Sequence, residues 1–304
     1  HFSLVLREGV AEQGMGARAA LDESVARLDQ SFAGQPAVQA RLLLSLAEIY
    51  LAAGDNAACL STVARLADSP ALMAGLTTRQ QGETWLTRVT AQLRLGQVDD
   101  ATASLDAWRT TIPGFGGEAL AAEHAIAAAT LRRLKGEPLP ALEDQNRAVA
   151  ALDAAPDATV MARGIAHANL GTALLQAGKF APAREQFERA IALWNSGGLS
   201  LNWNVLTTRT NLAHLALLQG DERVALAEYG DIERSLRARG DRSASFAALI
   251  NGKARALLAI GDGRTAAQLA DEALAILDAR SGGQGLDRIG VLLSRIDIGL
   301  ANGE

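Results

Sequence analysis

Seven glycines recur along this chain at nearly equal spacing, and this recurrence restricts the fold more than any other feature of the sequence. Their successive separations are 42, 40, 42, 42, 41 and 42 residues. The glycines are Gly54, Gly96, Gly136, Gly178, Gly220, Gly261 and Gly303. Self-similarity at a period of about 20 to 50 residues is the sequence signature of an array of stacked structural repeats.

The residues around these glycines repeat with helical spacing. Before Gly178, one helical face is formed by His167, Leu170, Gly171 and Leu174, spaced i, i+3, i+4 and i+7. After it, a second stripe is formed by Phe180, Ala183, Phe187 and Ala190. Each glycine therefore separates two amphipathic helices, and glycine suits the left-handed backbone conformation at which a helix ends.

Two positions of the repeat are occupied mostly by small side chains, which let two antiparallel helices approach closely. Five residues after the first six glycines stand Cys59, Ala101, Ala141, Ala183, Ala225 and Ala266. Seven residues before all seven stand Ala47, Val89, Ala129, Gly171, Ala213, Ala254 and Ile296. The sequence predicts an all-α fold of about seven helical hairpins over residues 36–304. Residues 1–35 are predicted to form an opening helix pair, with helices near 1–12 and 17–33.

Composition agrees with an all-α array and argues against some functions. Ala and Leu, the strongest helix formers, dominate, and aromatic residues make up only 4%. The net charge is −5, from 29 cationic and 34 acidic side chains, so the electrostatic attraction that nucleic-acid binding needs is missing. The single cysteine, Cys59, excludes an intrachain disulfide. No run of 18 apolar residues predicts a membrane span within the chain.

The repeat resembles the tetratricopeptide repeat, whose signature is W-x2-L-G-x2-Y…A-x3-F. The copy around Gly178 matches it at Leu170, Gly171, Ala183, Phe187 and Ala190, and Trp85 and Tyr50 stand at the signature Trp and Tyr of two other copies. Departures from the signature are Arg88, Lys253 and Arg295 in place of Leu and Gln145 in place of the aromatic. The resemblance implies a right-handed superhelix, an α-solenoid, with a concave groove that binds a protein or peptide.

The helix before each glycine is expected to line that groove, because its opposite face forms the core. Six residues before the glycines, this inner position holds Glu48, Thr90, Thr130, Thr172, His214, Arg255 and Asp297. Asn169, Asn211 and Asn251 lie one turn away. In tetratricopeptide domains such asparagines and basic residues hold peptide main chain or a carboxylate, which implies that role for Asn169, Asn211, Asn251 and Arg255. The alternative is that these residues are merely solvated.

Signatures of catalysis and cofactor binding have plainer explanations in this chain. The G-x-G-x-x-A run from Gly261 to Ala266 lacks the preceding strand of a dinucleotide site, and Gly261 is the glycine of the repeat. His124, His167 and His214 lie at different positions of the repeat, so no zinc site is expected. We expect Cys59 to be a buried, inert thiol and Pro113–Gly117 to be a flexible loop. Trp203, between hairpins, is either an interface anchor or a staple on the next helix. The sequence predicts neither a catalytic site nor a bound metal or cofactor.

One segment points to a parent protein. Residues 21–55, with the pattern D-Q-x-F…Q-P-x-x-Q-A-R-L-L, resemble the opening of the repeat region that follows the catalytic domain of many bacterial serine/threonine kinases. The resemblance implies a sensory domain outside the cytoplasm, in the periplasm, with the apolar opening HFSLVL placed just after a membrane span. The alternative is the effector arm of a cytoplasmic transcriptional activator or an assembly adaptor, and the fold alone hosts both.

Overall fold

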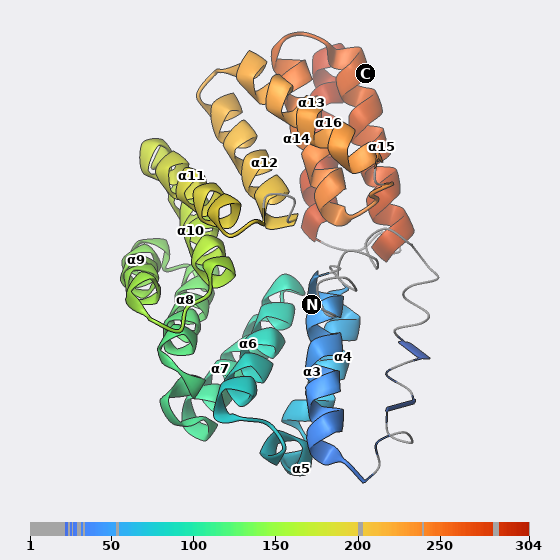
Figure 1. Cartoon of the computed structure of the whole chain (residues 1–304). Helices are drawn as coiled ribbons and strands as arrows, with labels where there is room; N and C mark the ends of the chain where they lie inside the picture. The colour runs from blue at the N-terminus through green and yellow to red at the C-terminus, as the bar shows by residue number, and fades with distance from the viewer. Residues whose placement is uncertain are drawn as a thin grey trace. The chain divides into compact units, whose positions relative to one another are not determined.

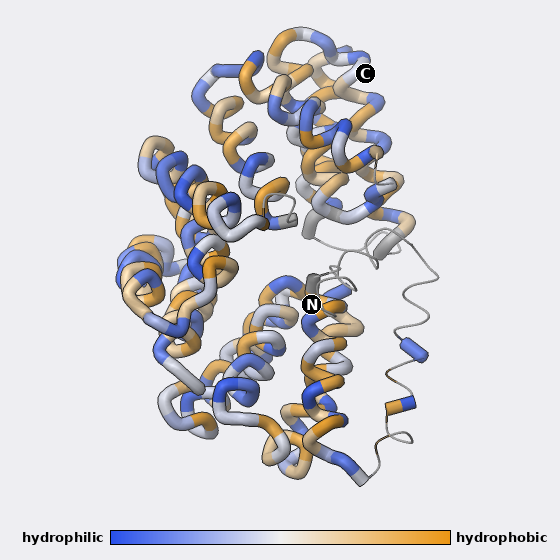
Figure 2. Tube along the Cα trace, in the orientation of Figure 1, coloured by the Kyte–Doolittle hydropathy of each residue, from blue (hydrophilic) through white to orange (hydrophobic). Residues whose placement is uncertain are grey.

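The computed structural model describes residues 34–52, 55–199, 203–238, 240–281 and 286–303, together with six isolated positions between 22 and 32. Every regular element among these residues is a helix (Figure 1). Each long helix carries both hydrophobic and hydrophilic residues, as an amphipathic helix packed on its neighbours must (Figure 2). The predicted all-α fold is confirmed.

The helices pair into antiparallel hairpins in the predicted register. The described residues form six complete hairpins: α3 (Pro36–Ala52) with α4 (Asn56–Ala67), α6 (Thr78–Arg94) with α7 (Val98–Thr111), α8 (Glu118–Leu134) with α9 (Pro138–Ala154), α10 (Val160–Gln176) with α11 (Phe180–Ser196), α12 (Trp203–Leu218) with α13 (Glu222–Ala238), and α14 (Ala244–Ala259) with α15 (Gly263–Ser281). A further helix, α16 (Leu286–Asn302), packs against α14 and α15. Two short elements, α5 (Pro70–Ala74) and η1 (Pro113–Gly116), lie between hairpins.

The periodic glycines end the first helix of each hairpin, as predicted. All six that the structure describes have positive φ, between 70° at Gly178 and 92° at Gly136. After Gly178, the N–H of Lys179 donates to the carbonyl of Leu174 at 2.9 Å and that of Gly178 to Leu175 at 3.0 Å. These two bonds are the Schellman motif that closes a helix C-terminus. Gly54 lies outside the described residues.

The small residues let the paired helices come close together. Ala101, Ala183 and Ala225, five residues after their glycines, are fully buried. Gly171 lies against the buried ring of Phe187, and a Cβ added at Gly171 would meet that ring at 2.7 Å. The exception is Ile296 in α16, which was expected at a packed position but is exposed, because no second helix covers this face of α16 among the described residues.

Three departures from the repeat signature are explained by ion pairs. Arg88, Lys253 and Arg295 each stand where the signature has a leucine. Arg88 pairs with Asp68 at 2.9 Å, Lys253 with Glu233 at 2.6 Å, and Arg295 with Asp271 at 2.8 Å. Each acidic partner lies on, or directly after, the second helix of the preceding hairpin. A polar contact between hairpins therefore replaces an apolar one at these positions.

The chain divides into two compact units, residues 1–166 and 167–304. The division falls within α10, between Ala166 and His167. Trp108, Leu120 and Leu131 belong to a core cluster of the first unit, whereas Tyr229, Phe246 and Ile276 belong to one of the second.

Two segments outside the hairpins were the subject of predictions, residues 1–35 and residues 113–117. The expected helix near 1–12 lies outside the described residues, and of the helix near 17–33 only single helical positions are described, among them Leu28, buried against Leu43 and Leu66. The segment Pro113–Gly117 lies between hairpins, as expected, and Pro113–Gly116 form the short turn η1, in which Gly114 and Phe115 have φ of 58° and 59°. A hydrogen bond of 3.1 Å from Trp108 Nε1 to the carbonyl of Phe115 holds this turn. The flexibility of the segment stays a prediction.

Candidate partner-binding face

The side chains predicted to bind a partner all lie on the first helices of hairpins. Helix α8 of the first unit carries Thr130. The other six belong to the second unit and are here called the first-helix ladder: Asn169 and Thr172 on α10, Asn211 and His214 on α12, and Asn251 and Arg255 on α14. The residues between them that face the hairpin interior, such as Ala213 and Ala254, are fully buried. The helical period therefore directs the ladder away from the partner helix of each hairpin.

The threonines at this position use their hydroxyl protons within their own helices. Thr130 donates to the carbonyl of Ile126 at 2.9 Å, and Thr172 donates to that of Ala168 at 3.0 Å. Thr90 does the same one hairpin earlier, to Leu86 at 2.7 Å. Such bonds satisfy a hydroxyl without a ligand. The threonine oxygens remain able to accept a hydrogen bond but have no proton to offer.

Two of the asparagines join neighbouring first helices. Asn211 Nδ2 lies 3.5 Å from Thr172 Oγ1, at the outer limit of a hydrogen bond, and Asn251 Nδ2 donates to Ser294 Oγ of α16 at 3.3 Å. The Oδ1 atom of Asn251 is buried without a hydrogen-bond partner among the described residues. Asn169 is exposed and makes no side-chain hydrogen bond there. The structure thus brings Asn211 and Thr172 together, and places Asn251 between helices rather than in the open.

His214 and Arg255 are the two ionisable residues of the ladder. Burial lowers the pKa of His214, and the positive charge of Arg255 lowers it further. The imidazole is therefore neutral near pH 7. Arg255 is exposed and forms no ion pair with any described residue. A cation beside a neutral imidazole and amide groups can hold a carboxylate or a peptide main chain.

The remaining histidine and thiol candidates are structural. His167 is buried, and its Nδ1 lies 2.7 Å from Gln186 Oε1. Cys59 is fully buried, and burial raises the pKa of its thiol to about 12 although Arg94 opposes the rise. A thiol so far from ionisation is a poor nucleophile. Over the part of the chain that the structure describes, no three His, Cys, Asp or Glu side chains are grouped so that they could hold a metal ion.

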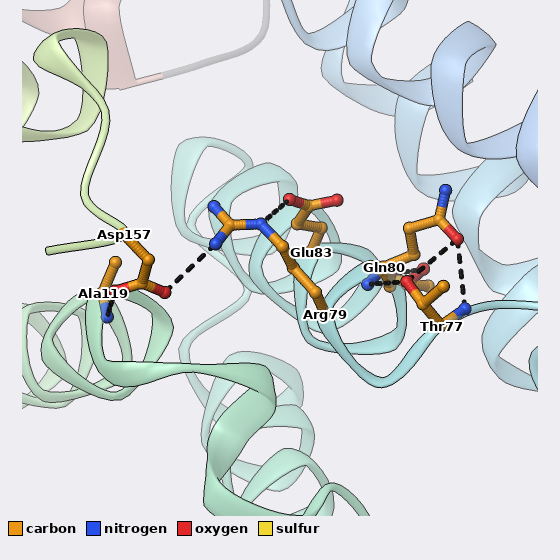
Figure 3. Close-up of polar contacts among 7 residues, drawn as sticks. Thr77, Arg79, Gln80, Glu83, Ala119 and Asp157 are labelled. Carbon is orange, nitrogen blue, oxygen red and sulfur yellow. Dashed lines mark hydrogen bonds and ion pairs between the residues drawn. The ribbon is translucent and has the colours of Figure 1, made fainter.

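An ionic cluster in the first unit was not expected from the sequence. Arg79 of α6 pairs with Glu83 at 3.0 Å and with Asp157 at 3.1 Å, and Asp157 also accepts from the N–H of Ala119 at 3.0 Å (Figure 3). Burial raises the pKa of the neighbouring Glu123 to about 7, Arg79 opposes the rise, and the negative charges of Glu83 and Asp157 add to it. The cluster ties α6, the start of α8 and the segment after α9 together.

A shallow cavity of about 340 Å³ lies between α7 and α8. Its polar lining includes Thr102, Arg109, His124, Arg132, Lys135 and Glu137. The cations are already satisfied, since Lys135 donates to Thr102 Oγ1 at 2.9 Å and Arg132 pairs with Glu137 and Asp144. Burial lowers the pKa of His124, which leaves its ring neutral. Arg132 and Arg133 lie in the last turn of α8, where a positive charge is favoured by the helix dipole.

The structure also exposes an apolar stripe on α16 that sequence reasoning missed. Ile289, Leu293, Ile296 and Leu300 lie along one side of the helix, each more than half exposed. Their helical spacing is visible in the sequence, but from the sequence alone it predicts a buried face rather than an exposed one. Trp203 begins α12, and its side chain lies outside the described residues.

Comparison with solved structures places the chain among tetratricopeptide repeat proteins by fold. A tetratricopeptide repeat protein from Parabacteroides merdae aligns over 96% of this chain and 98% of its own, with a TM-score of 0.52 and 15% identity. The apo form of the quorum sensor NprR from B. thuringiensis aligns over 95% and 81%, with a TM-score of 0.53 and 13% identity. A signal transduction ATPase with a tetratricopeptide repeat sensor from Pyrococcus horikoshii aligns over 97% and 45%, with a TM-score of 0.56 and 10% identity.

At these identities the likeness concerns the fold alone, and it confirms the predicted tetratricopeptide-type α-solenoid. No protein-family model and no curated protein matches the sequence. None of the described helices is both long and apolar enough to pass through a bilayer. The partner-binding role of the ladder stays a prediction.

Proposed function

We propose that this chain is a non-catalytic domain that binds a protein or peptide along the first helices of its second unit. The observation that carries the proposal is Arg255, an exposed cation without an ion-pair partner among the described residues, next to neutral His214. Asn211 and Asn251 stand on the same two helices, and the exposed Asn169 lies on the first helix of the preceding hairpin.

The chemistry of these groups defines the ligand class. Arg255 supplies paired donors to a carboxylate, from an acidic side chain or a peptide C-terminus. The exposed Asn169 amide offers a donor and an acceptor to a peptide bond, and the Asn211 amide offers its oxygen, so an extended peptide with an acidic group is the ligand that uses these groups together with Arg255.

We further propose that the domain is the ligand-sensing or scaffolding region of a bacterial signalling protein, a serine/threonine kinase with this region outside the cytoplasm. The resemblance of residues 21–55 to the repeat region of such kinases supports this. Two of the solved structures above are described as a sensor, which supports a sensing role without supporting a kinase. The effector arm of a cytoplasmic transcriptional activator or adaptor is the alternative. The sequence upstream of His1 in the gene product distinguishes these two proposals, because the kinase proposal requires a kinase domain followed by an apolar span.

Binding is tested with a displayed library of peptides that have free carboxyl ends, selected on the immobilised chain. The enriched peptide is then titrated by calorimetry into the wild type, the Asn211→Ala/Arg255→Ala double variant and Arg234→Ala. Arg234 is a matched control, because it is an exposed arginine of the second helix α13 in the same unit. We expect the double variant to lose at least tenfold in affinity with unchanged circular dichroism, and the control to bind as the wild type does. Equal affinity of all three proteins would remove the ladder as the binding site.

A further inference from the structure

His214 and Arg255 occupy equivalent positions on neighbouring first helices. His214 lies six residues before Gly220 on α12, and Arg255 lies six residues before Gly261 on α14. The two helices pack directly against each other. His214 is half-buried and forms no hydrogen bond with any described residue, and Arg255 is exposed. The imidazole therefore lies in the field of a cation that no described acidic side chain offsets.

The other titratable groups next to α12 on the α13 side are already neutral or paired. Glu228 of α13 forms an ion pair of 2.7 Å with Arg209 of α12 itself. Burial raises the pKa of Tyr229 far above its usual value, so its hydroxyl stays un-ionised at any physiological pH. Neither contributes a free charge near His214.

The charged groups of α11 and of the rest of α14 are likewise not directed at His214. Arg184 of α11 donates to Gln219 at the end of α12 at 2.8 Å, and Lys253 of α14 is paired with Glu233 at 2.6 Å. The other charged residues of α11 are exposed: Glu185, Glu188 and Arg189. Among the residues that the structure describes, Arg255 is the one charged group that shifts the pKa of His214.

A carboxylate bound to Arg255 would change the environment of the imidazole in two ways. It would offset the positive charge that holds the pKa of His214 down, and it would bring a negative charge close to the ring. Both changes favour the protonated ring. Histidine is the side chain for which such a change moves the charge across the physiological pH range.

We infer that a ligand carboxylate seated on Arg255 draws a proton from the solvent onto His214, so that the ladder binds acidic peptides more tightly as the pH falls. The inference rests on the proposed function, because it requires a carboxylate at Arg255. The ring is neutral near pH 7 in the free chain and keeps its proton to a higher pH in the complex, so affinity rises as the pH falls from about 8 to about 5.5. The carboxylate of the peptide, with a pKa of about 4, stays ionised over this range. We expect about five- to tenfold tighter binding at the lower pH.

The coupling between the two residues is tested first without a peptide. Nuclear magnetic resonance of the whole chain follows the ring C–H signals of the histidines through a pH titration, and His214→Asn identifies the His214 signal by its loss. Arg255→Gln should raise the pKa of His214. Arg234→Gln, which alters an exposed arginine of α13, should leave it unchanged. An unchanged pKa in Arg255→Gln would overturn the inference.

Calorimetry then measures proton uptake with the peptide enriched in the selection described above. The wild type should bind it about five- to tenfold more tightly at pH 5.5 than at pH 8, and His214→Asn should change by less than about twofold. Titrations at pH 6.5 in buffers of different ionisation enthalpy should show net proton uptake by the wild type and almost none by His214→Asn. The same peptide with its acidic group converted to the amide is the matched control, and it should bind without proton uptake.

The outcomes separate this inference from the proposed function. Binding of equal strength at both pH values, or a pH dependence that persists in His214→Asn, would overturn the inference and leave the ladder as a binding site. If no acidic peptide is enriched, or if the Asn211→Ala/Arg255→Ala variant binds the enriched peptide as the wild type does, the proposed function fails and the inference fails with it.

Discussion

Replacement of Gly171 by alanine measures how much the close approach of α10 and α11 contributes to stability. An added Cβ would lie 2.7 Å from two ring carbons of Phe187, whereas carbon atoms pack best at about 3.5–4.0 Å. The ring is fully buried. Overpacking of this kind costs about 1–3 kcal/mol, and the better helix propensity of alanine returns about 0.5–1 kcal/mol. We expect Gly171→Ala to lower the free energy of unfolding by about 1–2 kcal/mol.

Gly230→Ala is the matched control, because Gly230 also lies inside a helix of the second unit, α13. The nearest atom to its added Cβ is the end of the flexible Arg234 side chain, at 3.7 Å. This variant should therefore show only the propensity gain and raise the free energy of unfolding by about 0.5–1 kcal/mol. Urea unfolding followed by far-UV circular dichroism compares both variants with the wild type.

Phe187→Leu provides the second check, because the shorter side chain leaves room for the added methyl group. In that background Gly171→Ala should cost nothing or stabilise, which gives a coupling free energy of about 1–3 kcal/mol in a double-mutant cycle. If Gly171→Ala stabilised the chain as much as Gly230→Ala does, the steric explanation of this glycine would be refuted.

Three more predictions concern titration, capping and reactivity. Burial raises the folded pKa of Glu123 to about 7, above its unfolded value, so the stability associated with this group is full at low pH and is lost as the pH rises through 7. Glu123→Gln should therefore stabilise the chain by up to about 3 kcal/mol near pH 8 and by little near pH 5. Equal effects at both pH values in thermal unfolding would contradict this. Asp157→Ala should lower the free energy of unfolding by about 1–2 kcal/mol, because it removes both the acceptor for the Ala119 N–H and the ion-pair partner of Arg79. Asp106→Ala breaks only an exposed ion pair and should lower it by less than about 0.5 kcal/mol. Cys59 should resist alkylation near pH 8 in the native chain and react once urea unfolds it, as mass spectrometry of the alkylated chain would show; fast native labelling would contradict its burial.

The register of the hairpins could be predicted because it depends on local chemistry. A glycine is required where the backbone turns left-handed at a helix end, and Gly178 and Gly220 do so at φ of 70° and 81°. Small residues are required where two helices come close, and Ala183 and Gly171 lie at such points. Both requirements recur with every hairpin, so the sequence repeats them.

The side-chain environment of the candidate site was less predictable, because it depends on contacts between hairpins. The sequence places Asn251 on the inner side of α14, but only the structure shows that its amide reaches Ser294 of the next first helix. Ile296 has the position of a core residue in the repeat, but it is exposed because no described helix covers this face of α16. The fold of η1 was missed because it depends on Trp108, an aromatic residue outside the glycine-rich segment itself.

The ion pairs of Arg88, Lys253 and Arg295 make the hairpins of this chain non-interchangeable. Each of these basic residues meets an acidic partner on the preceding hairpin. The partly exposed pairs of Arg88 and Arg295 are each worth less than about 1 kcal/mol, whereas the Glu233 partner of Lys253 is buried. A rearranged chain in which the α14–α15 hairpin followed any other neighbour would leave Lys253 without Glu233. These charged pairs therefore favour one order of the hairpins, and a leucine at the same position would remove that preference.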